Sequence, residues 1–83
     1  MALEAKSGAS VAPPSTGLVK RSLSIAGHRT SISLEDAFWR QLKTVAASRS
    51  QSLSAVIAEI DARRGEANLS SAIRVYILEA ALQ

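Results

Sequence analysis

The sequence predicts a mainly α-helical domain that begins with a short β-strand and continues through three helices. Two patterns carry this prediction. Polar and apolar side chains alternate over residues 29–34, and a period of two residues is typical of a strand. Three later segments repeat apolar residues every three to four positions, and each follows a residue suited to capping a helix.

The predicted strand, at about residues 29–34, has two chemically different faces. One face is formed by Thr30, Ile32 and Leu34, and the other by Arg29, Ser31 and Ser33. A single strand of this length is not stable by itself. The strand therefore needs a pairing partner, and its small, basic polar face is unsuited to a core.

The first helix is expected at about residues 35–48. The Ser33 side chain can accept a hydrogen bond from the amide three residues on, while Glu35 and Asp36 complement the helix dipole in the first turn. The expected buried side consists of Phe38, Trp39, Leu42, Val45 and Ala46. Core packing explains the two aromatic residues better than stacking on nucleic-acid bases does.

The second helix is expected at about residues 53–64, because Ser52 is a good N-cap and Gly65 is a natural stop after the last turn. Its apolar stripe consists of Leu53, Val56, Ile57 and Ile60.

The third helix is expected at about residues 69–82, with Asn68 or Ser70 as its cap. It is apolar around much of its circumference, and such a helix must be buried. A chain of 83 residues without cysteine has little else with which to bury it, so we expect a homodimer.

Composition excludes several classes of function. The absence of cysteine rules out thiol catalysis and Cys-based zinc sites, and fits a cytoplasmic location. The single histidine, His28, has no acidic cluster beside it, and neither a nucleophile elbow nor a glycine-rich phosphate loop is present. No apolar run approaches the roughly 20 residues that cross a bilayer. We expect no enzyme, no catalytic residue, no metal, no cofactor and no membrane contact.

Positive charge is concentrated before the first helix. The chain carries a net charge of +3, and residues 18–34 contain Lys20, Arg21 and Arg29 but no acid. Such a balance favours an anionic partner. Residues 1–17 are rich in Ala, Ser, Gly and Pro and are predicted to be a flexible tail, which leaves residues 18–83 as the domain.

Residues 18–26 alternate as well, because Leu23 and Ile25 oppose Ser22 and Ser24. Gly27 and His28 then offer a turn before the predicted strand. Two alternatives remain open for this segment: a short strand that forms a hairpin with residues 29–34, or an extended basic arm.

The order of strand, capped helix, polar turn and Ser-capped helix resembles the ribbon-helix-helix family of DNA-binding proteins, the class that includes Arc and MetJ. The resemblance rests on three stretches of sequence: Ile32-Ser33-Leu34, then Phe38, Leu42 and Val45, and finally Ser52, Ser54, Ala55 and Ile57. The block from Lys20 to Leu82 is similar to a bacterial branch of the family with an added third helix. Where the family often places glycine before the second helix, this chain has Ser50.

The resemblance implies an intertwined homodimer in which one strand from each chain pairs antiparallel. The resulting two-stranded ribbon would enter the major groove of double-stranded DNA, and its outward side chains would read base edges. Carried onto this sequence, the base contacts are Arg29, Ser31 and Ser33. The resemblance also implies a phosphate clamp at the second helix, at Ser52 and Ser54. Lys20 and Arg21 are further candidate phosphate contacts.

The implied function is sequence-specific DNA binding by a small transcriptional repressor in the cytoplasm, associated with the nucleoid. One alternative concerns register: the segment from Asn68 to Ile73 also reads like a second-helix start, which would move the phosphate clamp to Ser70 and Ser71. Another concerns function: an interaction or antitoxin-like module, in which the apolar third helix docks a partner protein.

Overall fold

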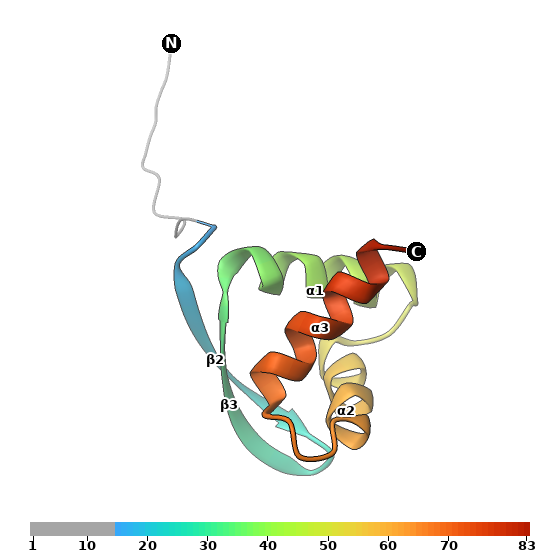
Figure 1. Ribbon diagram of the computed structural model, residues 1–83. Coiled ribbons are helices and arrows are strands. Elements are labelled where there is room, and N and C mark those ends of the chain that lie inside the picture. The colour runs from blue at the N-terminus through green and yellow to red at the C-terminus, as the bar shows by residue number, and fades with distance from the viewer. Residues whose placement is uncertain (1–14) are drawn as a thin grey trace.

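The computed structural model describes residues 15–83, which form a β-hairpin followed by three helices. The elements are β2 (Leu18–Ile25), β3 (His28–Glu35), α1 (Asp36–Ser48), α2 (Leu53–Arg63) and α3 (Leu69–Ala81). The long, curved hairpin runs along one side of the helices (Figure 1). A strand followed by three helices is confirmed, and β3 is one residue longer at each end than the predicted strand.

The ribbon forms within one chain. Strands β2 and β3 pair antiparallel from Leu18 opposite Glu35 to Ile25 opposite His28. The two loop residues have positive φ, 52° at Ala26 and 85° at Gly27, which are the angles of a type I′ turn. The pairing partner of residues 29–34 is therefore residues 18–25 of the same chain, as in the hairpin alternative, and this pairing does not come from the second chain that the resemblance implies.

The start of α1 differs from the prediction. Ser33 lies inside β3 and does not cap the helix; the N-cap is Glu35, whose side chain makes no capping hydrogen bond. The first amides of α1 instead donate to backbone carbonyls of the preceding segment, Asp36 to Gly17 at 2.8 Å and Ala37 to Ser15 at 3.1 Å. Strand β3 runs directly into the helix, so a side chain at Ser33 is too far back to reach it.

The same hydrogen bonds define the beginning of the described domain. Residues 15–17 belonged to the predicted tail, but Ser15 and Gly17 are tied to α1. Ser15 also accepts a hydrogen bond from Arg40 at 2.7 Å. The rest of the predicted tail, residues 1–14, lies outside the described residues.

The turn between α1 and α2 is a Schellman motif with Ser50 in the left-handed conformation, at φ 55°. The amides of Gln51 and Ser50 donate to the carbonyls of Ala46 and Ala47, at 2.9 and 3.1 Å. Ser50 thus adopts the conformation that favours glycine, the residue that the family often has here.

The predicted caps of the later helices are confirmed. The Ser52 hydroxyl accepts from the amide of Ala55 at 3.0 Å, and Gly65 follows α2 with φ 60°. Asn68 caps α3 by accepting from the amide of Ser71 at 2.8 Å.

One hydrophobic core joins the hairpin to the helices. Its buried members are Ile25, Ile32, Leu34, Trp39, Leu42, Ala46, Val56, Ile57, Ile60, Ile73 and Ile77. Trp39 is completely buried, and its indole N–H donates to the carbonyl of Val19 in β2 at 2.8 Å. Phe38 and Val45 are only half-buried, so the stripe of α1 is centred nearer to Trp39 than the sequence indicated.

Helix α3 is buried on one side only. Ile73 and Ile77 enter the core, whereas Val75, Leu78 and Leu82 are exposed. A single chain therefore leaves the second apolar side of α3 in contact with water.

Candidate nucleic-acid interface

The polar residues of both strands gather on one exposed face of the hairpin, which we call the outward ribbon face. The register places Lys20 opposite Ser33, Ser22 opposite Ser31, and Ser24 opposite Arg29. Directly paired residues of an antiparallel hairpin point to the same side. All six side chains are exposed except that of Ser33, which is half-buried.

This face follows directly from the alternation in both strands. On the opposite face, Val19, Leu23 and Ile25 of β2 join Ile32 and Leu34 of β3 against the helices. Because that face is held in the core, the outward residues cannot turn inward without exposing it. The short serine side chains leave the backbone of the ribbon accessible between two basic ends, Lys20 and Arg29.

Two outward residues, Ser22 and Ser24, were not among the predicted base contacts. The signal was available, because their alternation with Leu23 and Ile25 is visible in the sequence. The same alternation fits a hairpin strand and an extended arm, and only the strand places these serines beside Ser31 and Arg29. Because β2 pairs with β3, Ser22 and Ser24 lie beside Ser31 and Arg29, and the outward face is two strands wide.

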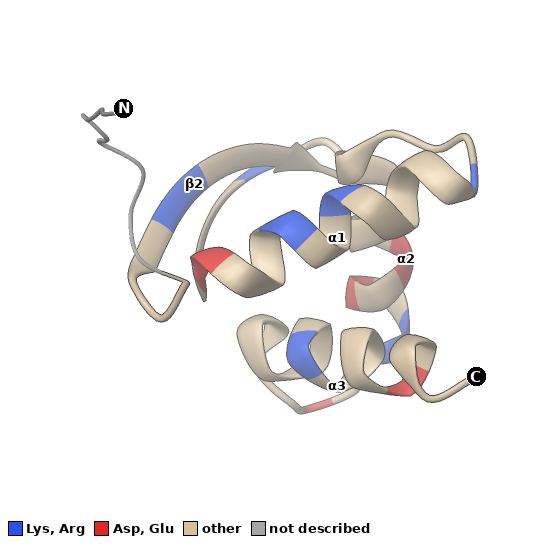
Figure 2. Ribbon diagram, turned by 90° about the horizontal axis from the view of Figure 1, so that it is seen from above, with Lys and Arg blue, Asp and Glu red and all other residues tan. Residues whose placement is uncertain are grey.

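Of the two cations predicted to contact phosphate in this strand, only Lys20 points outward. Arg21 pairs with Ile32 on the side facing the helices, and its guanidinium lies 5.4 Å from the centre of the Trp39 ring. Its Nε is buried and has no hydrogen-bond partner among the described residues. In Figure 2, Lys and Arg mark segments of β2 and α1, acidic residues mark the start of α1, and α2 and α3 carry residues of both signs.

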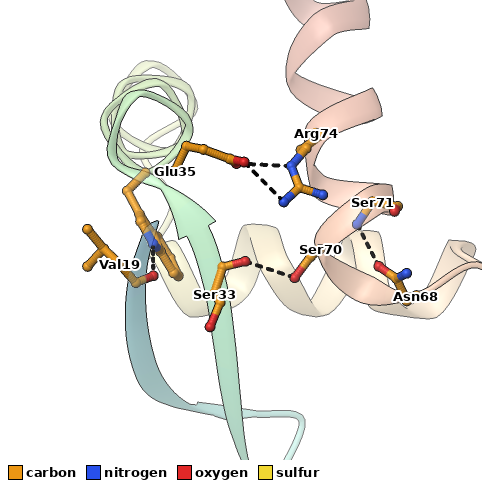
Figure 3. Close-up of polar contacts among 8 residues, drawn as sticks. Val19, Ser33, Glu35, Asn68, Ser70, Ser71 and Arg74 are labelled. Atoms are coloured by element: carbon orange, nitrogen blue, oxygen red, sulfur yellow. Dashed lines mark hydrogen bonds and ion pairs between the residues drawn. The ribbon is translucent and has the colours of Figure 1, made fainter. Parts of the chain in front are cut away.

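Helix α3 holds the end of the ribbon in place (Figure 3). The Ser70 hydroxyl donates to the backbone carbonyl of Ser33 at 3.0 Å. Arg74 donates to the two carboxylate oxygens of Glu35, at 3.0 and 3.5 Å, and its guanidinium lies 5.9 Å from the centre of the Phe38 ring. These contacts join α3 to the point where β3 continues into α1.

The same cluster perturbs one titrating group. A hydrogen bond from its own backbone amide lowers the pKa of the Glu35 carboxyl, and the hydrogen bond and positive charge of Arg74 lower it further. Desolvation acts in the opposite direction but is outweighed. Glu35 therefore stays ionised, and paired with Arg74, to a lower pH than an isolated glutamate.

The predicted phosphate clamp lies apart from the ribbon. Ser52 and Ser54 stand at the start of α2, and no hydrogen bond among residues 15–83 connects them to either strand. Each helix start has one amide bonded to its cap, Ala55 to Ser52 and Ser71 to Asn68, but in the alternative clamp the Ser70 hydroxyl also donates to the Ser33 carbonyl. The exposed start of α2 is the better placed of the two for an anion.

Neither a metal site nor a membrane span is found in the part of the chain that the structure describes. Residues 15–83 contain no group of three or more His, Cys, Asp or Glu side chains that could hold a metal ion. None of their helices is long and apolar enough to cross a membrane.

Comparison with known proteins agrees with this architecture. A family model described as a ribbon-helix-helix domain matches residues 18–81. Among solved structures, the chain is similar to an uncharacterized protein from Bordetella pertussis Tohama I, with a TM-score of 0.70 and 30% sequence identity. The alignment covers 82% of this chain but only 58% of that protein, while no curated protein matches. The chain therefore belongs to the ribbon-helix-helix family, whose members are generally DNA-binding transcription regulators.

Proposed function

We propose that this protein is a sequence-specific DNA-binding protein, a small transcriptional repressor that acts as a homodimer in the cytoplasm, associated with the nucleoid. The observation that carries the proposal is the outward ribbon face, which is exposed, basic and built on a rigid core. A two-stranded ribbon fits the major groove of B-DNA, which is about 12 Å wide. Each chain carries a complete ribbon, so each copy in the dimer reads its own part of the operator.

The residues of this face divide into proposed roles. Arg29 has the planar fork of donors that pairs with the O6 and N7 atoms of guanine. Ser31 and Ser33 can donate to or accept from several bases, and Ser22 and Ser24 extend the same reading surface onto β2. Ser33 lies closest to α3, which limits its freedom to move.

Phosphate contacts would position the ribbon. Lys20 lies at one end of the outward face, where its flexible chain reaches a backbone phosphate. Ser52 and Ser54 would bind a second phosphate through the free amides of the first turn of α2. Arg21 could contribute only through its terminal amino groups, because its Nε is buried beside Trp39.

The test begins with selection of the preferred operator from random DNA by the purified protein. Arg29→Ala should then lose about 1–3 kcal/mol of binding free energy on that operator and much less on random DNA, because a base contact is lost. Binding is measured by fluorescence anisotropy at one salt concentration.

Arg63→Ala is the matched control, because it removes the same charge from a side chain that is 77% exposed at the end of α2. It should weaken both kinds of DNA equally and only slightly. If Arg29→Ala behaved in the same way, Arg29 would not read a base.

A further inference from the structure

The exposed side of α3 is the largest unexplained apolar feature of the described residues. Val75, Leu78 and Leu82 are 52%, 58% and 77% exposed, respectively, on a helix whose other side is in the core. Their spacing of three and then four residues places them in one line along the helix. Such a line of large side chains in contact with water requires an explanation.

Two apolar grooves border this line. One, of about 310 Å³, lies towards α1 and is lined by Phe38, Ile77 and Ala81 among others. The other, of about 320 Å³, lies towards α2; it is lined by Ile60, Ala72 and Tyr76, and charged side chains also line it, among them Glu59, Arg63 and Glu79. Val75 borders both grooves and Leu78 borders the one towards α1, so the line begins as a ridge between them. A second helix with the same profile could pack its ridge against it.

The positions also match a short coiled-coil seam. Val75 and Leu82 occupy the first position of successive heptads and Leu78 the fourth, and a β-branched residue followed by leucine favours two parallel strands. Arg74 and Glu79 then flank the seam on opposite sides. In a parallel pair these are the two positions, five residues apart, that meet across the interface.

We propose that a second copy of this chain covers this face, with the two α3 helices parallel about a two-fold axis and Arg74 of each copy beside Glu79 of the other. Charge complementarity selects this arrangement, because an antiparallel pair would bring flanks of like charge together. In the described residues Glu79 makes no ion pair, while Arg74 engages Glu35 through Nε and one terminal amino group only. Its other amino group is therefore available to the second copy.

The interface leaves the candidate DNA surface free. Ser70 and Arg74 contact β3 from outside the seam, so the ribbon of each copy is not covered. The inference rests on the homodimer of the proposed function and assigns that dimer a surface other than the ribbon. It requires no DNA, so dimerisation and DNA binding can fail separately.

Sedimentation of the full chain without DNA tests the surface. The native protein should be a dimer, and Leu78→Lys should weaken dimerisation at least about 100-fold, because each dimer buries this leucine twice. Leu18→Lys is the matched control, since it makes the same change at a leucine that is 65% exposed on β2. It should sediment as the native protein does. Circular dichroism should show that both variants are folded.

Disulfide cross-linking tests whether the two α3 helices are parallel. Because the native chain has no cysteine, only the introduced thiols can form the disulfide. Leu82→Cys should form a disulfide-linked dimer under mild oxidation, because equivalent positions of a parallel seam face each other. Ala47→Cys, at an exposed position of α1 outside the seam, should cross-link much less.

Three results would overturn the proposal. The first is a native protein that sediments as a monomer, whether or not another protein binds α3. The second is a dimer whose affinity does not change in Leu78→Lys. The third is a dimer in which Leu82→Cys forms no disulfide between the two copies. Operator binding is measured separately on native protein and on Leu78→Lys, so loss of DNA binding alone would count against the proposed function and not against this interface.

Discussion

The hydroxyl group of Tyr76 is buried in α3 and has no hydrogen-bond partner among residues 15–83. The ring is packed against the core and lies 5.3 Å from the guanidinium of Arg49. The aromatic body therefore stabilises the fold, whereas the buried, unpaired oxygen costs free energy.

Tyr76→Phe should raise the free energy of unfolding by up to about 1 kcal/mol, because it removes the unpaired hydroxyl and keeps the ring. Urea denaturation measures the change. Tyr76→Leu is the comparison: it also removes the hydroxyl but loses the ring beside Arg49, and it should be less stable than Tyr76→Phe. A loss of stability in Tyr76→Phe would mean that the hydroxyl has a partner in solution.

At the scale of elements, the contact between α3 and the junction of β3 with α1 depends on an ion pair. Arg74 joins Glu35 across 39 positions of sequence, and Ser70 adds a hydrogen bond to the same strand. The third helix therefore acts as a brace for the end of the ribbon.

Acid should weaken this brace. The pKa of Glu35 is lowered in the folded protein, so the unfolded chain takes up a proton first. The contribution of the pair is fully present above the unfolded value of about 4.3 and is lost as the pH falls through the lower folded value. Thermal unfolding between pH 7 and pH 3 should show a steeper loss in the native protein than in Glu35→Gln.

Glu66→Gln serves as the control for this experiment, because Glu66 is exposed in the loop before α3 and forms no ion pair among the described residues. It should retain the native loss of stability in acid. An equally steep loss in Glu35→Gln would assign the acid sensitivity to other carboxyl groups.

At the scale of the whole molecule, the distribution of positive charge determines how strongly DNA binding depends on salt concentration. Among residues 15–83, the cations before α1 lie on the hairpin, with Lys20 and Arg29 on its outward face. Neutralisation of DNA phosphates releases bound counterions, so each such contact adds to the salt dependence of binding.

Lys20→Ala should reduce the slope of log K against log salt by about one for each copy that binds, and hence by about two for a dimer with both ribbons on DNA. Affinity measured between about 50 and 200 mM salt provides the slope. Arg29→Ala should change specificity more than slope if it reads a base. An unchanged slope in Lys20→Ala would show that this lysine contacts no phosphate.

The elements of this protein were predictable because their signals are local. The alternation over residues 29–34, the caps at Ser52 and Asn68 and the stop at Gly65 depend only on near neighbours, and all are confirmed. The cap assigned to Ser33 was wrong because the strand continues without a break to Glu35. No local pattern marks that continuation.

The sequence by itself determined the order of the elements, the family resemblance and which side chains of β3 face outward. The tertiary structure decided which strand pairs with β3, because a two-residue turn at Ala26 and Gly27 closes a hairpin before a second chain is needed. It also decided that Arg21 faces Trp39 and that one side of α3 is left exposed. Alternation defines two faces of a strand, but only packing against helices determines which residues of a neighbouring strand share the outward one.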